Sequence, residues 1–228
     1  VIVNKVKNKS KNKNIWIPRN LDDKSIFYKL LANKGHNVTN QSLIEKEAIK
    51  INNLPKCDWI FFNSIFSFDS IKGLKNKFLN KKIAAFGKAT ASYLNKNGLN
   101  VDYVGKGSPL ETAKGFKEIL NNNEIVFFPS SNRTLGTVQS ILDEKNKIVI
   151  PTYNTSLIEV TVKSHDFYVF TSPSNVEAFF KMNQIHSQKV ISIGPSTTKK
   201  LKDFGVKDVK EAFESTELAL VDVVSSLI

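Results

Sequence analysis

Short apolar runs alternate with helix-like stretches along most of the chain. The runs are rich in β-branched and aromatic residues, and many end in glycine or a helix-capping residue, which is typical of strands. They predict strands over residues 15–18, 59–63, 83–87, 101–104, 124–129, 147–150, 167–171, 190–194 and 208–210. The stretches between them predict helices over residues 25–34, 90–97, 110–120, 175–181, 197–204 and 217–227. Because strands and helices alternate, we expect an α/β fold with parallel sheets flanked by helices.

The pattern of the chain repeats once, with an offset of 107 or 108 residues. The equivalent positions are Ser64 and Ser172, Gly87 and Gly194, Gly98 and Gly205, and Ser108 and Ser215. Two copies are too few for a self-stacking solenoid, so we interpret each copy as a domain with its own core. We expect the ligand site in a cleft between the two domains.

The repeat is permuted, because residues 16–19 near the start resemble residues 127–130. The amino-terminal βα piece is therefore expected to pair with the carboxy-terminal half, while the middle of the chain folds on itself. The predicted parts are a disordered Lys/Asn-rich tail (1–13), a discontinuous α/β domain (14–40 plus 155–228), an inserted α/β domain (44–150) and two connectors (39–43 and 151–156). Two crossings between the domains would form a hinge with limited twist.

The 228 residues carry a formal net charge of +12, which would attract a polyanion. Nucleic acid, an anionic membrane surface and a small polycarboxylate or polyphosphate all fit this charge, so charge alone does not choose among them. The sequence has no apolar run near 18 residues and does not begin with a secretory signal pattern. We therefore expect a soluble, cytoplasmic protein.

Several common motifs do not occur. No Gly-x-Gly-x-x-Gly pattern follows a predicted strand, and the segment 105–108 does not match a phosphate-binding loop. The single Cys57 is interpreted as a buried thiol rather than a nucleophile. The three histidines lack the spacing of metal ligands, so we expect no metal site.

Small hydroxyl and amide side chains follow many predicted strands, where the next helix begins. These junctions are at residues 63–64, 87–90, 129–132, 171–175, 194–197 and 215–216. In an open parallel sheet, ligands bind beyond the carboxyl ends of the strands. Helix starts at this edge present unpaired N–H groups that favour an anion. At any one junction the side chain could simply cap the helix, but the six together predict an anion-lined cleft.

The ordered set of motifs resembles the uroporphyrinogen-III synthase family. The matching segments are 58–64, 83–94 and 101–104 in the first half, and 150–155, 170–176 and 193–198 with Leu201 and Gly205 in the second. The match runs from about residue 15 to the end. The resemblance implies two similar flavodoxin-like α/β domains joined by a two-stranded connector, with the middle of the chain forming one domain and both ends forming the other.

The resemblance also implies the reaction. In this family a lyase closes hydroxymethylbilane, with loss of water and inversion of the last pyrrole ring, to give uroporphyrinogen III in heme and porphyrin biosynthesis without metal or cofactor. The substrate carries eight carboxylates, which suits helix starts surrounded by lysines. Unaided, the bilane closes to the symmetric isomer, so control of geometry is most of the catalysis. A proton donor near the leaving hydroxyl would help to form the azafulvene cation and then a spiro intermediate.

Tyr153 is the candidate proton donor, because it matches the tyrosine of the family's connector and lies at the predicted domain crossing. The alternative role is an aromatic side chain that packs at the hinge. The residues expected to bind substrate carboxylates are Ser64, Thr90, Ser172, Ser174, Thr197 and Arg19. For the serines and threonines the alternative is helix capping, and for Arg19 it is an exposed surface position. The chain departs from the family at Asn63 and at residues 130–133, which affects the contacts expected there.

Two other functions remain open at the sequence level. The first is a non-catalytic module that binds a small anion or nucleotide and whose charge recruits nucleic acid. The second is an enzyme with a bound nucleotide cofactor, which the missing glycine pattern disfavours. For the synthase interpretation we expect a monomer that acts on a small-molecule polycarboxylate, with no nucleic acid or membrane partner, and a transient contact with hydroxymethylbilane synthase is left open.

Overall fold

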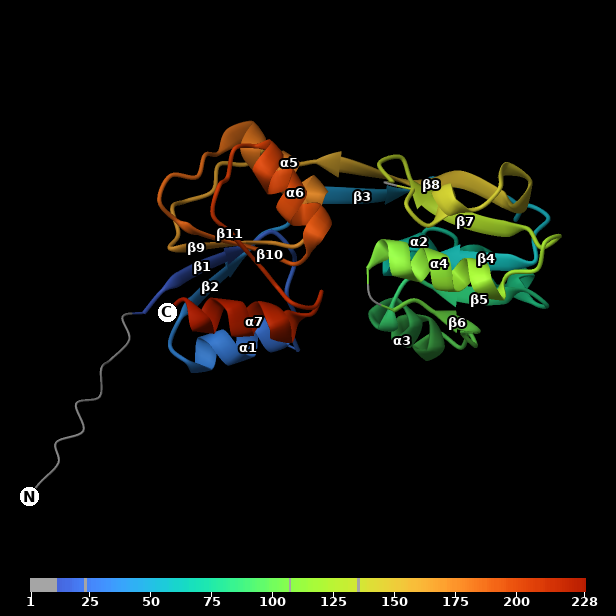
Figure 1. Ribbon diagram of the computed structural model, residues 1–228, viewed down its shortest axis with the longest axis horizontal. Coiled ribbons are helices and arrows are strands. Elements are labelled where there is room, and N and C mark those ends of the chain that lie inside the picture. The colour runs from blue at the N-terminus through green and yellow to red at the C-terminus, as the bar shows by residue number, and fades with distance from the viewer. Residues whose placement is uncertain (1–11, 23, 107, 135) are drawn as a thin grey trace, which may run out of the picture. The chain divides into compact units, whose positions relative to one another are not determined.

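A computed structural model describes residues 12–22, 24–106, 108–134 and 136–228. The chain divides into two compact units (Figure 1). Unit 1 combines the described residues up to Glu45 with Leu157–Ile228, and unit 2 is Lys46–Ser156. The predicted tail lies almost wholly outside the described residues. Lys13, which was assigned to it, is part of unit 1, because its carbonyl accepts the N–H of Asn37 at 2.8 Å.

Unit 1 is a five-stranded parallel sheet in the order β11-β10-β9-β1-β2. Its strands are β1 (Asn14–Ile17), β2 (Asn37–Asn40), β9 (Phe167–Phe170), β10 (Lys189–Ser192) and β11 (Val209–Glu211). Its helices are α1 (Ile26–Asn33), α5 (Pro173–Met182), α6 (Pro195–Asp203) and α7 (Glu217–Ser226). Side chains alternate across each strand, so Ile15 and Ile17 pack under α1 and α7, while Trp16 packs under α5. Figure 1 shows α1 and α7 on one face of the sheet and α5 and α6 on the other.

Unit 2 has a six-stranded sheet in the order β3-β8-β7-β4-β5-β6. Its strands are β3 (Ile44–Ala48), β4 (Trp59–Phe62), β5 (Lys82–Ala85), β6 (Tyr103–Val104), β7 (Val126–Ser131) and β8 (Lys147–Leu157). Its helices are α2 (Ile65–Asp69), α3 (Lys88–Lys96) and α4 (Pro109–Ile119), with 3₁₀ turns η1 (Lys72–Phe78), η2 (Gln139–Ile141) and η3 (Glu144–Asn146). Ile60 and Phe62 face α2, η1 and α3, whereas Trp59 and Phe61 face α4 and η2.

The two units share one strand plan, which explains the repeat in the sequence. Strands β4-β5-β6 and β9-β10-β11 run in the same order, and β7 and β1 occupy the same place beside β4 and β9. Gly98 and Gly205 follow α3 and α6 with φ of +75° and +84°, a left-handed conformation that glycine adopts without steric cost. The α/β fold with parallel sheets flanked by helices is confirmed.

Two strands and one helix were not predicted. Strand β2 includes Thr39 and Asn40, expected in the first connector, and pairs them with Trp16 and Ile17. Strand β8 continues beyond residue 150 through the segment expected as the second connector. Both β2 and β3 lie at sheet edges and are mostly exposed, so they lack the apolar run that predicts a buried strand. Helix α2 is only five residues long, too short to show a period.

Candidate active site

The carboxyl edge of the unit 2 sheet brings three of the predicted residues to one side. Strands β7, β4 and β5 are parallel neighbours, so their carboxyl ends lie at the same edge. Ser64 follows β4, Thr90 follows β5, and Tyr153 on β8 pairs with Ser131 at the end of β7. This edge is where open parallel sheets bind ligands.

Tyr153 is a buried phenol with one polar neighbour. Tyr153 is only 6% exposed, and its hydroxyl lies 3.5 Å from the hydroxyl of Ser64. The ring of Phe66 packs against it edge-on at 5.1 Å between centroids. Burial raises the pKa of Tyr153, and the hydrogen bond with Ser64 only partly opposes this shift. The phenol is therefore neutral at physiological pH and able to donate a proton.

Ser64 caps α2 in addition to contacting Tyr153. Its Oγ accepts the N–H of Ser67 at 3.2 Å, and Ser67 Oγ accepts the N–H of Ser64 at 3.2 Å, which is a reciprocal capping box. The cap fixes the position of the Ser64 hydroxyl at the edge of the sheet. Capping and contact with the candidate proton donor are thus both present in one side chain.

Thr90 and Thr197 occupy equivalent places in the two units. Each is the third residue of its helix, Thr90 in α3 and Thr197 in α6, and they are 7% and 1% exposed. The N-cap residue is a glycine in both helices, Gly87 and Gly194, and supplies no side-chain hydrogen bond. These two helix starts therefore keep first-turn N–H groups without a side-chain cap, the arrangement that suits a carboxylate.

Ser172 and Ser174 belong to α5 of unit 1. Ser172 caps the helix, because its Oγ accepts the N–H of Asn175 at 3.2 Å and the Nδ2 amide of the same residue at 2.9 Å. Ser174 is the second residue of α5 and is half-buried. Helices α5 and α6 pack side by side, so both serines and Thr197 lie on the same face of the unit 1 sheet and near its carboxyl edge.

Arg19 is paired rather than free. Its guanidinium lies 3.4 Å from Glu217 at the start of α7, and Arg19 remains about 40% exposed. The other oxygen of Glu217 accepts the hydroxyl of Ser25 at 2.9 Å and the N–H of Phe27 at 3.1 Å. The carboxylate of Glu217 therefore already pairs with Arg19 and with the start of α1. Arg19, Ser25 and Glu217 line a cavity of about 420 Å³ in unit 1.

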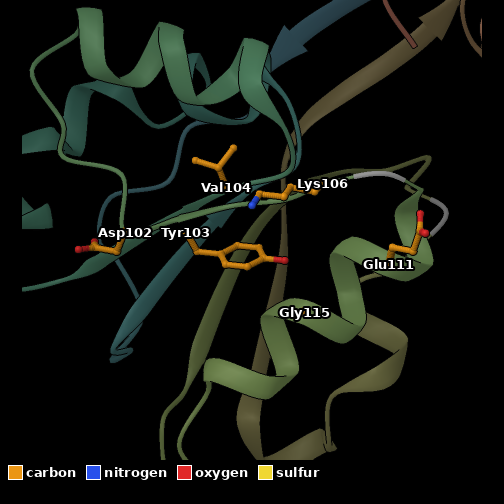
Figure 2. Close-up of a pocket in the computed structure, with 6 residues that line it drawn as sticks. All are labelled: Asp102, Tyr103, Val104, Lys106, Glu111 and Gly115. Carbon is orange, nitrogen blue, oxygen red and sulfur yellow. The ribbon is translucent and has the colours of Figure 1, made fainter. Parts of the chain in front are cut away.

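A second cavity, of about 580 Å³, lies between β6 and α4 in unit 2 (Figure 2). Its polar groups hold the fold together. Tyr103 donates its hydroxyl to the carbonyl of Thr112 at 2.8 Å, Asp102 accepts the N–H of Ile83 at 2.8 Å, and Glu111 caps α4. Figure 2 shows Asp102 and Tyr103 extending in opposite directions. The groups do not converge on one point, so this cavity is not the candidate site.

Three further residues lie near the predicted ones; Asn63 and Asn175 belong to expected junctions but were not singled out as site residues, and Lys46 was not expected there. Buried atoms without a hydrogen-bond partner among the described residues include Asn63 Nδ2 and Asn175 Oδ1, next to Ser64 and Ser172. Lys46 of β3 lies over the ring of Phe66. Asn63 stood out as a departure from the family, but Lys46 lies in a polar segment that gave no signal.

Three further features concern the cysteine, metal binding and membrane-spanning helices. Cys57 is buried, and burial raises the pKa of its thiol. Within the described ranges, no group of three or more His, Cys, Asp or Glu side chains could hold a metal ion. None of the described helices is long and apolar enough to cross a membrane.

Comparison with known proteins identifies the family. The family model described as "Uroporphyrinogen-III synthase HemD" matches residues 25–222. The crystal structure of uroporphyrinogen-III synthetase from Helicobacter pylori is similar, with a TM-score of 0.71, 19% identity, and coverage of 96% of this chain and 100% of that chain. A mutant uroporphyrinogen III synthase from Thermus thermophilus is also similar, with a TM-score of 0.59, 15% identity, and coverage of 94% of this chain and 98% of that chain. No curated protein sequence gives a significant match. Because the family model covers most of its length, the chain belongs to the uroporphyrinogen-III synthase family.

Proposed function

We propose that this chain converts hydroxymethylbilane into uroporphyrinogen III, with loss of water, ring closure and inversion of the terminal pyrrole ring, and that Tyr153 is the proton donor. Membership of the family supports the reaction. The observation that supports the residue is the buried, neutral phenol of Tyr153 beside Ser64 at the carboxyl edge of the unit 2 sheet.

The first step under this proposal is proton transfer from Tyr153 to the leaving hydroxyl of the substrate. The C–O bond breaks, water leaves, and the first pyrrole ring, which carried the hydroxymethyl group, becomes an azafulvene cation. The substituted carbon of the last ring then attacks the cationic carbon and forms a spiro intermediate. The bond between that carbon and its original methylene bridge then breaks, and the free α-carbon of the same ring bonds to the released methylene carbon, which closes the macrocycle with the last ring inverted. Loss of a proton restores the aromatic pyrrole and returns the proton to the phenolate.

The uncapped helix starts at Thr90 and Thr197 and the serines at the other junctions are proposed to hold substrate carboxylates. Their N–H and hydroxyl groups are fixed by the fold, so binding needs little reorganisation. Holding several carboxylates also restricts the path that the last ring follows, which is how geometry would favour isomer III over the symmetric product.

The product isomer tests the reaction. Purified protein receives freshly made hydroxymethylbilane, the products are oxidised, and the porphyrin isomers are separated by chromatography. We expect a shift from isomer I, the uncatalysed product, to isomer III. Isomer I alone from well-folded protein would reject the proposed activity and favour the anion-binding module.

The Tyr153→Phe variant tests the proton donor. We expect kcat to fall by about 100-fold, the lower end of what general acid catalysis contributes, while KM changes by less than about twofold. Phe keeps the ring contact with Phe66, so the fold should be retained, and circular dichroism checks this. Full activity in the variant would remove Tyr153 from the mechanism.

We further propose that the chain acts as a cytoplasmic monomer and receives its substrate during a transient contact with hydroxymethylbilane synthase. The support is chemical, because free bilane closes unaided and long diffusion would yield isomer I. Sedimentation analysis tests the oligomeric state. A coupled assay of the two enzymes at increasing dilution tests the contact. A share of isomer III that does not change with dilution would contradict it.

A further inference from the structure

Lys46 lies beside the candidate proton donor through a chain of contacts within unit 2. Its Nζ sits over the ring of Phe66, 5.5 Å from the centroid. Phe66 in turn packs edge-on against Tyr153, whose hydroxyl lies 3.5 Å from Ser64. Strands β3 and β8 are neighbours in the sheet and α2 supplies Phe66, so three elements fix these positions. We call Lys46, Phe66, Tyr153 and Ser64 the Lys46 cluster.

The ammonium of Lys46 has no anionic partner in the described part of the chain. Lysines elsewhere, such as Lys82 and Lys181, pair with glutamates at 2.7 and 2.9 Å. Glu45 and Glu47 flank Lys46 in sequence, but alternate residues of a strand point to opposite faces. The Phe66 ring is thus the one contact found for this cation within the described residues.

The surroundings of Lys46 disfavour an unpaired charge. Its side chain is exposed to solvent, yet desolvation by the surrounding protein lowers its pKa. A cation–π contact compensates only part of such a cost, about 0.5–1 kcal/mol at exposed sites. An anion brought by a ligand would complete the arrangement, and a polycarboxylate substrate supplies one.

We propose that Lys46 binds a carboxylate of hydroxymethylbilane and so holds the reacting end of the substrate near Tyr153. The inference rests on the proposed function for the identity of the substrate. Phe66 connects the two groups, because its ring contacts both the ammonium of Lys46 and the ring of Tyr153. Lys46 is a substrate-binding residue in this scheme, and the proton still comes from Tyr153.

The test compares Lys46→Gln with two matched variants. Lys46→Arg keeps the cation. Lys72→Gln removes a lysine that also lies over a phenylalanine ring in unit 2, at 5.9 Å from the centroid of Phe68. Within the described residues, the ring contacts of Phe68 are with Phe62, Phe78 and Tyr93 and do not include Tyr153. Each Gln variant lowers the net charge by one, so general attraction of a polyanion is matched.

Two readouts are used: KM for hydroxymethylbilane, and the affinity for uroporphyrin I, a stable octacarboxylate measured by fluorescence titration. We expect Lys46→Gln to raise KM and weaken uroporphyrin binding by about tenfold, the loss of one charge-assisted hydrogen bond. Lys46→Arg should keep both values within about threefold, and Lys72→Gln within about twofold. Thermal melts confirm that each variant is folded.

The outcomes separate this inference from the proposed function. If Lys46→Gln and Lys72→Gln behave alike in both readouts, the role of Lys46 is rejected, even if the wild type makes isomer III. If the wild type makes only isomer I, the reaction is rejected. A tenfold loss of uroporphyrin affinity confined to Lys46→Gln would still support a carboxylate site at Lys46.

Discussion

At the scale of single residues, the candidate site depends on how burial changes the chemistry of a phenol. The phenol of Tyr153 is a weak acid, and its burial in the protein disfavours the phenolate and so raises the pKa of Tyr153. The nearby Ser64 hydroxyl stabilises the phenolate slightly, which eases the release of the proton without leaving the group ionised at rest. A general acid needs this combination, a proton present at working pH and a partner for the charge that remains.

The raised pKa of Tyr153 predicts the pH dependence of the reaction. The phenol keeps its proton below its folded-state pKa, which burial raises above the ordinary value of a tyrosine. We therefore expect kcat to show no alkaline loss from Tyr153 between about pH 7 and pH 9. Since Ser64 lowers this pKa, Ser64→Ala should move any alkaline loss to still higher pH. The pH–rate profiles of both proteins are the measurement. A loss near pH 8 that Tyr153→Phe abolishes would contradict the raised pKa of Tyr153, whereas an unchanged pH–rate profile and rate in Tyr153→Phe would contradict its role as the proton donor.

At the scale of helices and strands, serines that cap helices also lie at the carboxyl edge of the sheet in their own unit. Ser172 satisfies the N–H of Asn175 at the start of α5, and Ser64 does the same for α2. Ser174 lies inside the first turn of α5, and the cap of this helix is Ser172. The two serines therefore allow capping to be distinguished from the proposed carboxylate binding within one helix.

Substituting the two serines of α5 tests that separation. Ser172→Ala should lower the free energy of unfolding by about 1 kcal/mol, the usual cost of losing an N-cap. Ser174→Ala should change it by less than about 0.5 kcal/mol. Both should raise KM if the hydroxyls bind carboxylates. Chemical denaturation and steady-state kinetics provide the two measurements. A rise in KM that follows stability alone, in Ser172→Ala only, would assign Ser172 to capping and remove Ser174 from the proposed carboxylate-binding residues.

The sequence predicted the elements that have a strong local signal. Buried strands such as Trp59–Phe62 and Phe167–Phe170 are continuous apolar runs. The edge strands Asn37–Asn40 and Ile44–Ala48 carry polar side chains, so nothing in their composition distinguishes them from loops. Their pairing depends on neighbours far away in the chain.

For the candidate site too, the sequence indicates the residues that belong to local motifs but not the contacts between distant segments. Tyr153 and the helix starts follow from the order of motifs along the chain, and the structure places Ser64 next to Tyr153. The pairing of Arg19 with Glu217 joins residues almost 200 positions apart, and the contact of Lys46 with Phe66 depends on an unpredicted strand. Neither contact has a local signature, because each arises only when the sheet forms.

At the scale of the molecule, the two units present equivalent binding features. The helix starts that match between them are α2 and α3 in unit 2 and α5 and α6 in unit 1, which follow the equivalent strands β4, β5, β9 and β10. In each pair, one helix is capped by serine and the other begins at a glycine without a side-chain cap. The repeat thus gives each unit a matching pair of helix starts, and under the proposed function both pairs would hold carboxylates of the substrate.

The net charge of +12 predicts that substrate capture depends on salt. Long-range attraction between this charge and eight carboxylates is screened as the Debye length falls from about 10 Å at 0.1 M salt to about 3 Å at 1 M. We expect KM to rise by roughly three- to tenfold between 0.05 and 0.5 M NaCl. The value of kcat should stay within about twofold, because the bound substrate is already held at short range. Steady-state kinetics across this range, with sucrose at equal osmolality as the control, make the measurement.

Deleting residues 1–11 removes four lysines and leaves eight of the net positive charges, so the salt dependence of KM should persist in that variant. A KM that ignores salt would show that capture relies on fixed hydrogen bonds alone, whereas a kcat that falls with salt would place the charges in the chemical step.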